Sequence, residues 1–356
     1  MGKLNIGILT SGGDCQALNA AMRGFAKALF HKCRDASIVG FEDGYKGLIY
    51  GKYRKMEKND FSGILTLGGT ILGTAREPFK KIGEPGENGV DKVESMVQNY
   101  KKLNLDCLVV LGGNGSIKTA NLLSEEGLNV VALPKTIDND IFGTDMTFGF
   151  MSAVEVATQA IDNIHTTAAS HSRVFIVEVM GHKTGHLALN AGIAGGSDII
   201  LIPEIPYRIE EVIKKIEERE GEGRHFTIIT AAEGALSEKD KFLSKKEMRK
   251  KRENVSVSFE IAAQIRLMSG KDVRVTIPGH TQRGGVPCPA DRILATRLGS
   301  AAVDYILTGK AGVMAAIVNG KITAVPLCEV AGKLKTVDVL GDEVLEAKSL
   351  GVSFGE

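Results

Sequence analysis

Short apolar runs alternate with longer amphipathic segments along most of the chain. The apolar runs predict buried strands at residues 4–9, 37–41, 107–111, 129–133, 174–179, 199–202, 227–231, 273–277 and 313–318. Apolar positions with helical spacing predict helices at residues 20–30, 91–103, 117–126, 148–168, 187–194, 209–219, 255–267 and 291–307. Strands that alternate with helices this regularly predict an α/β fold with mostly parallel sheets.

Three of the strands expected in the first half lead directly into loops rich in glycine or polar residues. Gly12 and Gly13 follow the first strand, GGNGS at 112–116 follows the third, and LPKTIDND at 133–140 leaves the fourth. The carboxyl ends of parallel strands share one edge of a sheet, and ligands bind there. Glycine turns that begin a helix direct backbone N–H groups at phosphate. Together the loops predict a site for a phosphate-rich ligand, although the first lacks the spacing of a P-loop or a GxGxxG motif.

The segment 133–140 carries the strongest candidate chemistry. Asp138 and Asp140 lie two residues apart and close to Lys135, an arrangement that is costly unless it serves a charged ligand. One carboxylate can act as a general base while the other holds a metal ion. Taken by itself, the segment also fits an acidic, solvated turn.

Composition limits the classes of protein that need considering. The chain has 356 residues, 43% of them hydrophobic and 24% charged, which suits two domains or one large one. A net charge of +1 gives no electrostatic reason to expect a nucleic-acid or membrane partner. We expect a cytoplasmic protein, because no apolar stretch approaches the ~18 residues of a membrane span and the start lacks the pattern of a signal peptide. The scattered cysteines also fit a reducing compartment: Cys15, Cys33, Cys107, Cys288 and Cys328.

A basic run at residues 239–253, KDKFLSKKEMRKKRE, interrupts the alternation in the second half. It could bind an anion or an effector, but its composition favours a solvated helix face or a mobile insertion. The polar segment 333–356 has no clear pattern.

Six motifs, in this order and spacing, resemble the 6-phosphofructokinase family: TSGGD, GGTILGTAR, GGNGS, PKTIDND, VEVMGH and GHTQRGG. The resemblance extends from Ile6 to about Gly320. It implies two similar Rossmann-like domains in the phosphofructokinase fold. Residues 1–149 and 282–332 would form the phosphoryl-donor domain, and residues 150–281 and 333–356 the sugar-phosphate domain.

The resemblance also implies an activity. Family members transfer a phosphoryl group from ATP to the 1-hydroxyl of D-fructose 6-phosphate, with Mg²⁺ as cofactor, at the committed step of glycolysis. A homotetramer with shared active sites is expected, or a homodimer. Three alternatives stay open: a pyrophosphate-dependent enzyme on the same fold, an NAD kinase, and a non-catalytic sensor of sugar phosphates.

Matching the motifs residue by residue implies roles in catalysis. Asp138 matches the catalytic base, and Thr136 the contact to the transferred phosphoryl group. Arg76 and Arg173 would spread the charge of the transition state, a role suited to a planar cation. Asp140 and Asn114 would hold the metal ion.

Two larger sets match the binding sites of the family. The nucleotide-binding set is Gly12, Tyr45, Arg76, Glu77, Gly113, Asn114, Gly115 and Ser116. The sugar-phosphate set is Thr136, Ile137, Asp138, Arg173, Met180, Gly181, His182, Glu233, Arg274, His280 and Arg283. Within the second set Arg274, His280 and Arg283 would hold the 6-phosphate, and Glu233 a sugar hydroxyl. Arg173 and Arg274 would reach the sugar phosphate of a neighbouring subunit.

The chain departs from the common bacterial pattern at several positions. Asn114 replaces an aspartate that helps to hold magnesium, and His182 replaces an arginine. The span from Glu233 to Arg274 is longer than in compact bacterial members, so their effector site is not assumed here.

The identity of the phosphoryl donor depends on Gly115 and Lys135. Pyrophosphate users carry aspartate and lysine at these positions, whereas typical ATP users carry glycine at both. Because glycine leaves room for the α-phosphate of a nucleotide, the mixed pair favours ATP.

Overall fold

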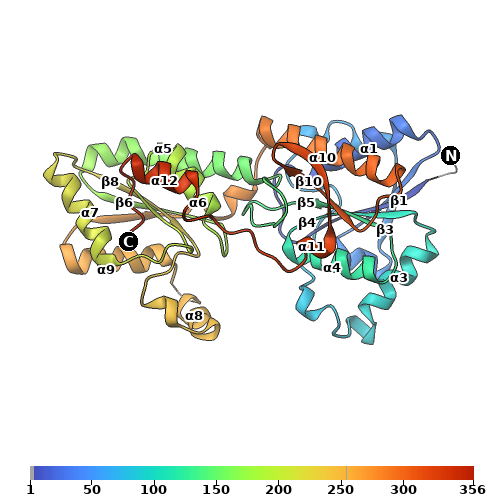
Figure 1. Ribbon diagram of the computed structural model, residues 1–356, viewed down its shortest axis with the longest axis horizontal. Coiled ribbons are helices and arrows are strands. Elements are labelled where there is room, and N and C mark those ends of the chain that lie inside the picture. The colour runs from blue at the N-terminus through green and yellow to red at the C-terminus, as the bar shows by residue number, and fades with distance from the viewer. Residues whose placement is uncertain (1–3, 254) are drawn as a thin grey trace. The chain divides into compact units, whose positions relative to one another are not determined.

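The computed structural model describes residues 4–253 and 255–356, and these form two compact units. Unit 1 extends to Ser152 and includes Arg283–Lys335, while unit 2 comprises Ala153–Gln282 and Thr336–Glu356. Each unit is built around one sheet with helices against it (Figure 1). Most strand pairs are parallel, which confirms the predicted α/β fold.

The sheet of unit 1 has seven strands in the order β11-β10-β5-β4-β1-β2-β3. Its five inner strands are parallel, and each edge strand pairs antiparallel with its neighbour. The strands are β1 (Asn5–Ser11), β2 (Ser37–Phe41), β3 (Tyr53–Met56), β4 (Cys107–Gly112), β5 (Val130–Pro134), β10 (Val313–Val318) and β11 (Lys321–Pro326). β4 and β5 are buried along their whole length, as their continuous apolar runs require in a sheet covered on both faces.

Helices cover both faces of this sheet. Figure 1 shows α1 and α10 on one side and α3, α4 and α11 on the other. The helices of unit 1 are α1 (Leu18–Lys32), α2 (Tyr45–Tyr50), α3 (Lys92–Lys102), α4 (Asn114–Glu125), α10 (Pro289–Leu307) and α11 (Leu327–Val330). Short 3₁₀ helices lie between these elements at η1 (Lys58–Phe61), η2 (Ile64–Thr66), η3 (Phe79–Lys81) and η4 (Glu87–Gly89). A core that includes Phe41, Leu108 and Ile117 lies beneath α2, α3 and α4.

The sheet of unit 2 has four parallel strands in the order β7-β8-β6-β9. They are β6 (Val174–Val179), β7 (Ile199–Leu201), β8 (Thr227–Ala232) and β9 (Val273–Thr276). Its helical elements are α5 (Phe150–His171), which begins at the end of unit 1, α6 (His186–Ala194), α7 (Ile209–Gly221), η5 (Asp240–Phe242), α8 (Lys245–Arg252), α9 (Val257–Ser269), η6 (Gly279–Arg283), which ends in unit 1, and α12 (Asp342–Ser349). Apolar side chains of α7 and α9, including Val212 and Ile261, form a core with the strands.

Several elements do not follow from the apolar pattern. Both edge strands are partly exposed; β3 is mostly polar, and Thr323 interrupts the apolar residues of β11. The basic run 239–253 forms η5 and α8, and the unassigned segment 333–356 contains α12. These helices escape the pattern because α8 has almost no apolar face and α12 buries only Val344 and Ala347.

All five cysteines are free thiols. None of the helices in the described part of the chain combines the length and the hydropathy needed to cross a bilayer.

Candidate active site

The three loops singled out in the sequence leave adjacent strands of unit 1. Ser11 at the end of β1 is in register with Gly112 at the end of β4, and Gly112 is in register with Pro134 of β5. The Lys135 N–H also donates to the Gly112 carbonyl over 3.1 Å. The parallel register therefore brings the glycine loops and the Asp138 segment to one edge of the sheet, as predicted.

Lys135 lies between the two glycine loops. Its ammonium group donates to the Gly13 carbonyl and lies 3.7 Å from the position that a Cβ of Gly12 would occupy. The side chain is buried, and burial lowers its pKa; Arg283 acts in the same direction, while Cys15 and Asp138 oppose it. A buried cation between two glycine loops is suited to a polyanionic ligand.

The Arg283 side chain lies against the first glycine loop. One guanidinium nitrogen lies 2.1 Å from the position that a Cβ of Gly13 would occupy, so any larger residue at 13 would displace the arginine. Its Nε is buried without a hydrogen-bond partner among the described residues. The structure thus brings Arg283, expected in the sugar-phosphate set, against the loop of the nucleotide set.

The Asp138 segment is held by hydrogen bonds on both sides. The Asp138 N–H donates to Thr136 Oγ1 over 3.0 Å, and Thr147 Oγ1 donates to the Thr136 carbonyl over 2.8 Å. Asn139 adopts a left-handed φ of 51°, and its side chain accepts from the Thr147 N–H over 3.1 Å. Because this turn is fixed, Asp138 stays half-buried while Asp140 is 9% exposed.

Asp140 and Asn114 contact each other across the loops. Asn114 Nδ2 donates to Asp140 Oδ2 over 2.9 Å and to the Asp140 carbonyl over 3.0 Å. Within the described residues, no cluster of three or more His, Cys, Asp or Glu side chains could hold a metal. One carboxylate beside an amide does fit Mg²⁺, which takes one or two protein carboxylates and completes its shell with phosphates and water.

The rest of the expected nucleotide set gathers around the same loops. Tyr45 is buried, and its hydroxyl donates to the Ser116 carbonyl over 2.8 Å, so it supports the first turn of α4. The segment leading to Arg76 is tied to the first loop, since the Gly12 N–H donates to the Ala75 carbonyl over 3.1 Å. Arg76 itself is exposed.

Two members of the nucleotide set differ in how much they are constrained. Glu77 pairs with Lys92 over 3.3 Å, which occupies its carboxylate within the protein. Gly115, in the first turn of α4, has nothing within 4 Å of the position of a Cβ. A side chain at this position would therefore extend into open space.

In unit 2 the turn after β6 meets the turn after β8. The His182 N–H donates to Glu233 Oε1 over 2.8 Å, and the Glu233 N–H donates to the Val179 carbonyl over 2.8 Å. A Cβ on Gly234 would lie 2.3 Å from the His182 carbonyl, so the two turns are in close contact. The expected residues Met180, Gly181, His182 and Glu233 thus lie together.

The element that carries His280 lies next to this pair of turns. Gln282, in η6, is fully buried and accepts from the Met180 N–H over 3.2 Å. It stands inside the motif GHTQRGG, but nothing in the sequence distinguishes a buried amide from an exposed one. Gln282 is therefore a supporting residue that the sequence reasoning did not identify.

Arg173 and Arg274 lie elsewhere in unit 2. Arg173 directly precedes β6, and Arg274 lies at the start of β9. Both pair with Asp272, Arg173 over 2.6 Å and Arg274 over 2.9 Å. Met180 and Glu233 follow the carboxyl ends of their strands. The two ends of the six-residue strand β6 are roughly 20 Å apart. The structure does not bring the two arginines to the other members of the sugar-phosphate set.

Comparison with known proteins identifies relatives of the whole chain. Residues 5–306 match the family model described as Phosphofructokinase. An ATP-dependent 6-phosphofructokinase of Spirochaeta thermophila is 53% identical, with 98% of this chain and 97% of the relative covered. One of Propionibacterium freudenreichii is 44% identical, with 99% and 100% covered. The crystal structure of Pichia pastoris phosphofructokinase in the T-state has a TM-score of 0.80 at 34% identity, covering 93% of this chain and 36% of that chain.

Proposed function

The chain belongs to the phosphofructokinase family, and from that premise we propose that it transfers the terminal phosphoryl group of ATP to the 1-hydroxyl of D-fructose 6-phosphate. The products are fructose 1,6-bisphosphate and ADP, the reaction of the committed step of glycolysis. The observation that carries the proposal is the convergence of two glycine loops and the Asp138 turn at one sheet edge. It combines N–H donors for phosphates with a carboxylate that can accept a proton.

Two observations favour ATP over pyrophosphate as the donor. The relatives at 44–53% identity are named ATP-dependent. Gly115 leaves the space beside the first turn of α4 open, where a nucleotide needs room. Lys135 is the residue that keeps pyrophosphate as the second candidate, because its buried ammonium would serve either donor.

In this reaction Asp138 accepts the proton of the sugar hydroxyl as the hydroxyl attacks the phosphoryl group. Its half-buried position at a fixed turn orients the carboxylate and limits competition from water. Thr136 contacts the moving phosphoryl group, and Ile137 belongs to the same sugar-binding segment. Arg76 contributes positive charge in the transition state, and so does Arg173 from a second copy of the chain.

Unit 1 is the phosphoryl-donor domain in this proposal, and unit 2 is the sugar-phosphate domain. Gly12, Gly113 and Ser116 bind phosphates of the donor. Asp140 and Asn114 hold Mg²⁺ when it is bound, and the ion supplies charge neutralisation to the donor phosphates. The contact between their side chains supports this pairing, because it places a carboxylate and an amide in one spot.

The residues of the expected sugar-phosphate set bind fructose 6-phosphate in this proposal. Glu233 accepts a sugar hydroxyl, Met180, Gly181 and His182 border it, and His280 and Arg283 hold the 6-phosphate. The contact of the Glu233 turn with the His182 turn supports this part of the proposal.

Arg173 and Arg274 act on the sugar phosphate of a second copy of the chain. Their distance from Glu233 along the sheet supports such sharing of sites. The assembly is a homotetramer, with a homodimer as the smaller alternative, and the protein works in the cytoplasm.

One assay tests the proposal. Purified protein is given fructose 6-phosphate and Mg²⁺ with either ATP or pyrophosphate, and fructose 1,6-bisphosphate is measured. We expect turnover with ATP. Turnover with pyrophosphate alone replaces the donor, and binding of fructose 6-phosphate without turnover by either donor supports the sensor, which Asn114 and His182 motivate.

A further inference from the structure

The turn that carries Glu233 is held by a side chain from the basic run. After β8 ends at Ala232, the chain leaves the sheet and its carbonyls lose their strand partners. Arg252, at the end of α8, donates from Nη1 to the Glu233 carbonyl over 2.7 Å and from Nη2 to the Ala235 carbonyl. A planar guanidinium with a fixed fork of donors is suited to binding two carbonyls of one turn.

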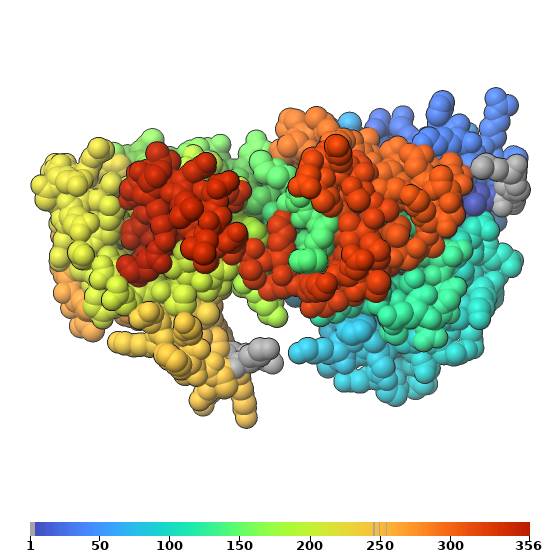
Figure 2. Space-filling view, in the orientation of Figure 1, coloured from blue at the N-terminus to red at the C-terminus, as the bar shows by residue number. Residues whose placement is uncertain are grey.

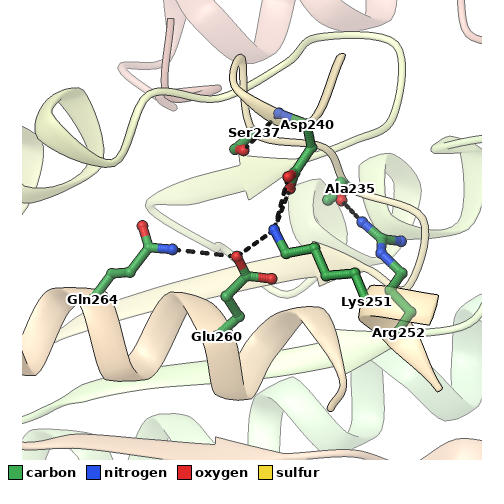
Figure 3. A network of polar contacts seen from close by, with 7 residues as sticks. All are labelled: Ala235, Ser237, Asp240, Lys251, Arg252, Glu260 and Gln264. Carbon is green, nitrogen blue, oxygen red and sulfur yellow. Dashed lines mark hydrogen bonds and ion pairs between the residues drawn. The ribbon is translucent and has the colours of Figure 1, made fainter. Parts of the chain in front are cut away.

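The neighbouring lysine fixes the helix from which Arg252 extends. Lys251 Nζ lies 2.7 and 2.8 Å from the two carboxylate oxygens of Asp240 and 2.6 Å from Glu260 Oε1 of α9 (Figure 3). Asp240 is only 7% exposed, and Ser237 Oγ accepts from its N–H over 3.2 Å. Lys251 therefore joins the two ends of the segment to α9.

The other end of α8 has its own local support. Ser244 and Glu247 form a capping box, with the Glu247 carboxylate accepting from the Ser244 N–H over 2.8 Å. The segment lies at the surface of unit 2, where Figure 2 shows it standing out from the neighbouring elements. Lys239, Lys241 and Lys250 are exposed, so the run combines solvated lysines with two cations that bind the protein itself.

This arrangement links the segment to the Glu233 carboxylate. Glu233 is fixed through its N–H to Val179 and through its carboxylate to the His182 N–H, while Arg252 holds its carbonyl. With Gly234 already against the His182 carbonyl, the turn has little freedom as long as Arg252 stays in place. Loss of the guanidinium would leave two carbonyls without their donors and free the turn to change its direction.

We propose that Arg252 is a positioning residue of the sugar site, which orients the Glu233 carboxylate toward the sugar hydroxyl through the backbone of residues 233–235. The proposal rests on the proposed function, because the role of Glu233 in binding fructose 6-phosphate comes from it. Arg252 touches no substrate, so its removal affects sugar binding and leaves donor binding unchanged.

The test compares Arg252→Met, Arg252→Lys, Glu233→Gln and the double variant Arg252→Met/Glu233→Gln. We expect Arg252→Met to raise the KM for fructose 6-phosphate about tenfold, with kcat changed less and the KM for ATP unchanged. Arg252→Lys restores part of the affinity. The double variant is no weaker than Glu233→Gln alone, since the two residues act as one unit.

Arg219→Met is the matched control. Arg219 also lies in unit 2, pairs with Asp198 over 2.8 Å and donates to the Phe226 carbonyl over 3.2 Å, but it has no contact with the Glu233 turn. It should lower the stability of unit 2 while leaving the KM for fructose 6-phosphate unchanged. A second measurement, made without substrates, is amide hydrogen exchange of residues 232–237, which should speed up in Arg252→Met and not in the control.

Four outcomes decide the matter. A wild-type KM for fructose 6-phosphate in Arg252→Met overturns the proposal, even if exchange is faster, because Arg252 is then only structural. Exchange at residues 232–237 that stays as in the wild type also overturns it, as do additive effects in the double variant. Wild-type protein that does not act on fructose 6-phosphate overturns the proposed function itself, which is a different result from a variant that retains its KM.

Discussion

The loops that follow β1, β4 and β5 in unit 1, which we call the donor loops after their proposed role, and the Glu233 turn of unit 2 are held in place by different means. The donor loops follow directly from β1, β4 and β5, and the pairing of these strands sets their positions. The Glu233 turn also follows a strand, but its carbonyl is bound by Arg252, nineteen residues further along the chain. Backbone pairing therefore positions the first site, while the second also depends on one side chain.

Lys135 of unit 1 and Lys251 of unit 2 also differ, in the direction in which the fold shifts their pKa. Burial lowers the pKa of Lys135, whose ammonium donates to a backbone carbonyl. Burial also opposes the charge of Lys251, but the hydrogen bonds that its ammonium donates to Asp240 and Glu260 raise its pKa overall. A cation paired with two carboxylates stabilises the fold, whereas a buried cation beside glycine loops is placed to bind an anionic ligand.

The largest effect that separates the two regions is expected from Asp138→Asn. The amide cannot accept the proton, so kcat should fall by about 10³- to 10⁴-fold while fructose 6-phosphate still binds. Steady-state turnover and calorimetric titration of fructose 6-phosphate measure the two properties. Near-normal turnover would falsify the assignment of Asp138 as the base, and the site residues of unit 1 would then have a role only in binding.

Gly115→Asp tests whether the donor loops select the nucleotide. Because the Cβ position is open, the variant should fold normally, and the effect is confined to ligand binding. Two anions about 4 Å apart repel by about 4 kcal/mol at an effective dielectric of about 20, so kcat/KM for ATP should fall by about 10²- to 10³-fold. Pyrophosphate has no α-phosphate or nucleoside and should be affected far less.

Gly115→Ala is the control, since it adds a Cβ without a charge. It should keep most of its ATP activity. If Gly115→Asp also keeps its ATP activity, Gly115 does not select the donor, and another residue of the loops must do so.

Arg283→Ala tests whether Arg283 binds fructose 6-phosphate or the phosphoryl donor. We expect fructose 6-phosphate binding to weaken by about 2 kcal/mol, the cost of losing a charge-assisted contact to phosphate, and ATP binding to change little. Its guanidinium lies against Gly13 in the donor loop, so both affinities need to be measured. Weaker binding of ATP alone would move Arg283 from the sugar site to the donor site.

The smallest effects come from the two lysines, which should respond in opposite directions. Lys135→Met removes a buried charge and should raise the free energy of unfolding at pH 7 by about 1 kcal/mol, while impairing activity. Lys251→Met leaves Asp240 and Glu260 without their cation and should lower it by about 1 kcal/mol, a value reduced by the partial exposure of the pair. Urea denaturation of each variant measures both changes.

The effect of Lys135→Met should depend on pH. The folded-state pKa of Lys135 lies below its ordinary value of 10.5, so between the two the unfolded chain binds more protons and the wild type gains stability as pH rises. The advantage of the methionine variant is therefore complete below the folded-state pKa and shrinks toward pH 10.5. If the difference in the free energy of unfolding between Lys135→Met and the wild type is constant from pH 7 to pH 10, burial of the Lys135 charge does not destabilise the folded protein.

Most of the fold could be predicted because its signals are local. The apolar runs at 107–111 and 129–133 became β4 and β5, since only a strand in a covered sheet buries every side chain of such a run. The glycine and aspartate loops met at one edge because parallel strands have their carboxyl ends together. β3, β11, α8 and α12 could not be predicted this way, because none of them carries a long uninterrupted apolar run: β11 pairs with the adjacent strand β10, and α12 buries only Val344 and Ala347.

By itself the sequence determined the α/β class, the loop that carries Asp138 and the family resemblance, because each of them is recognised from short patterns and their order along the chain. Only the tertiary structure decided that Arg283 lies against Gly13, that Arg173 and Arg274 converge on Asp272, and that Arg252 holds the Glu233 turn. These contacts join side chains to residues in other elements. Their geometry is set by how strands and helices pack, and a charged residue looks the same in a sequence whether it faces water or binds a carbonyl.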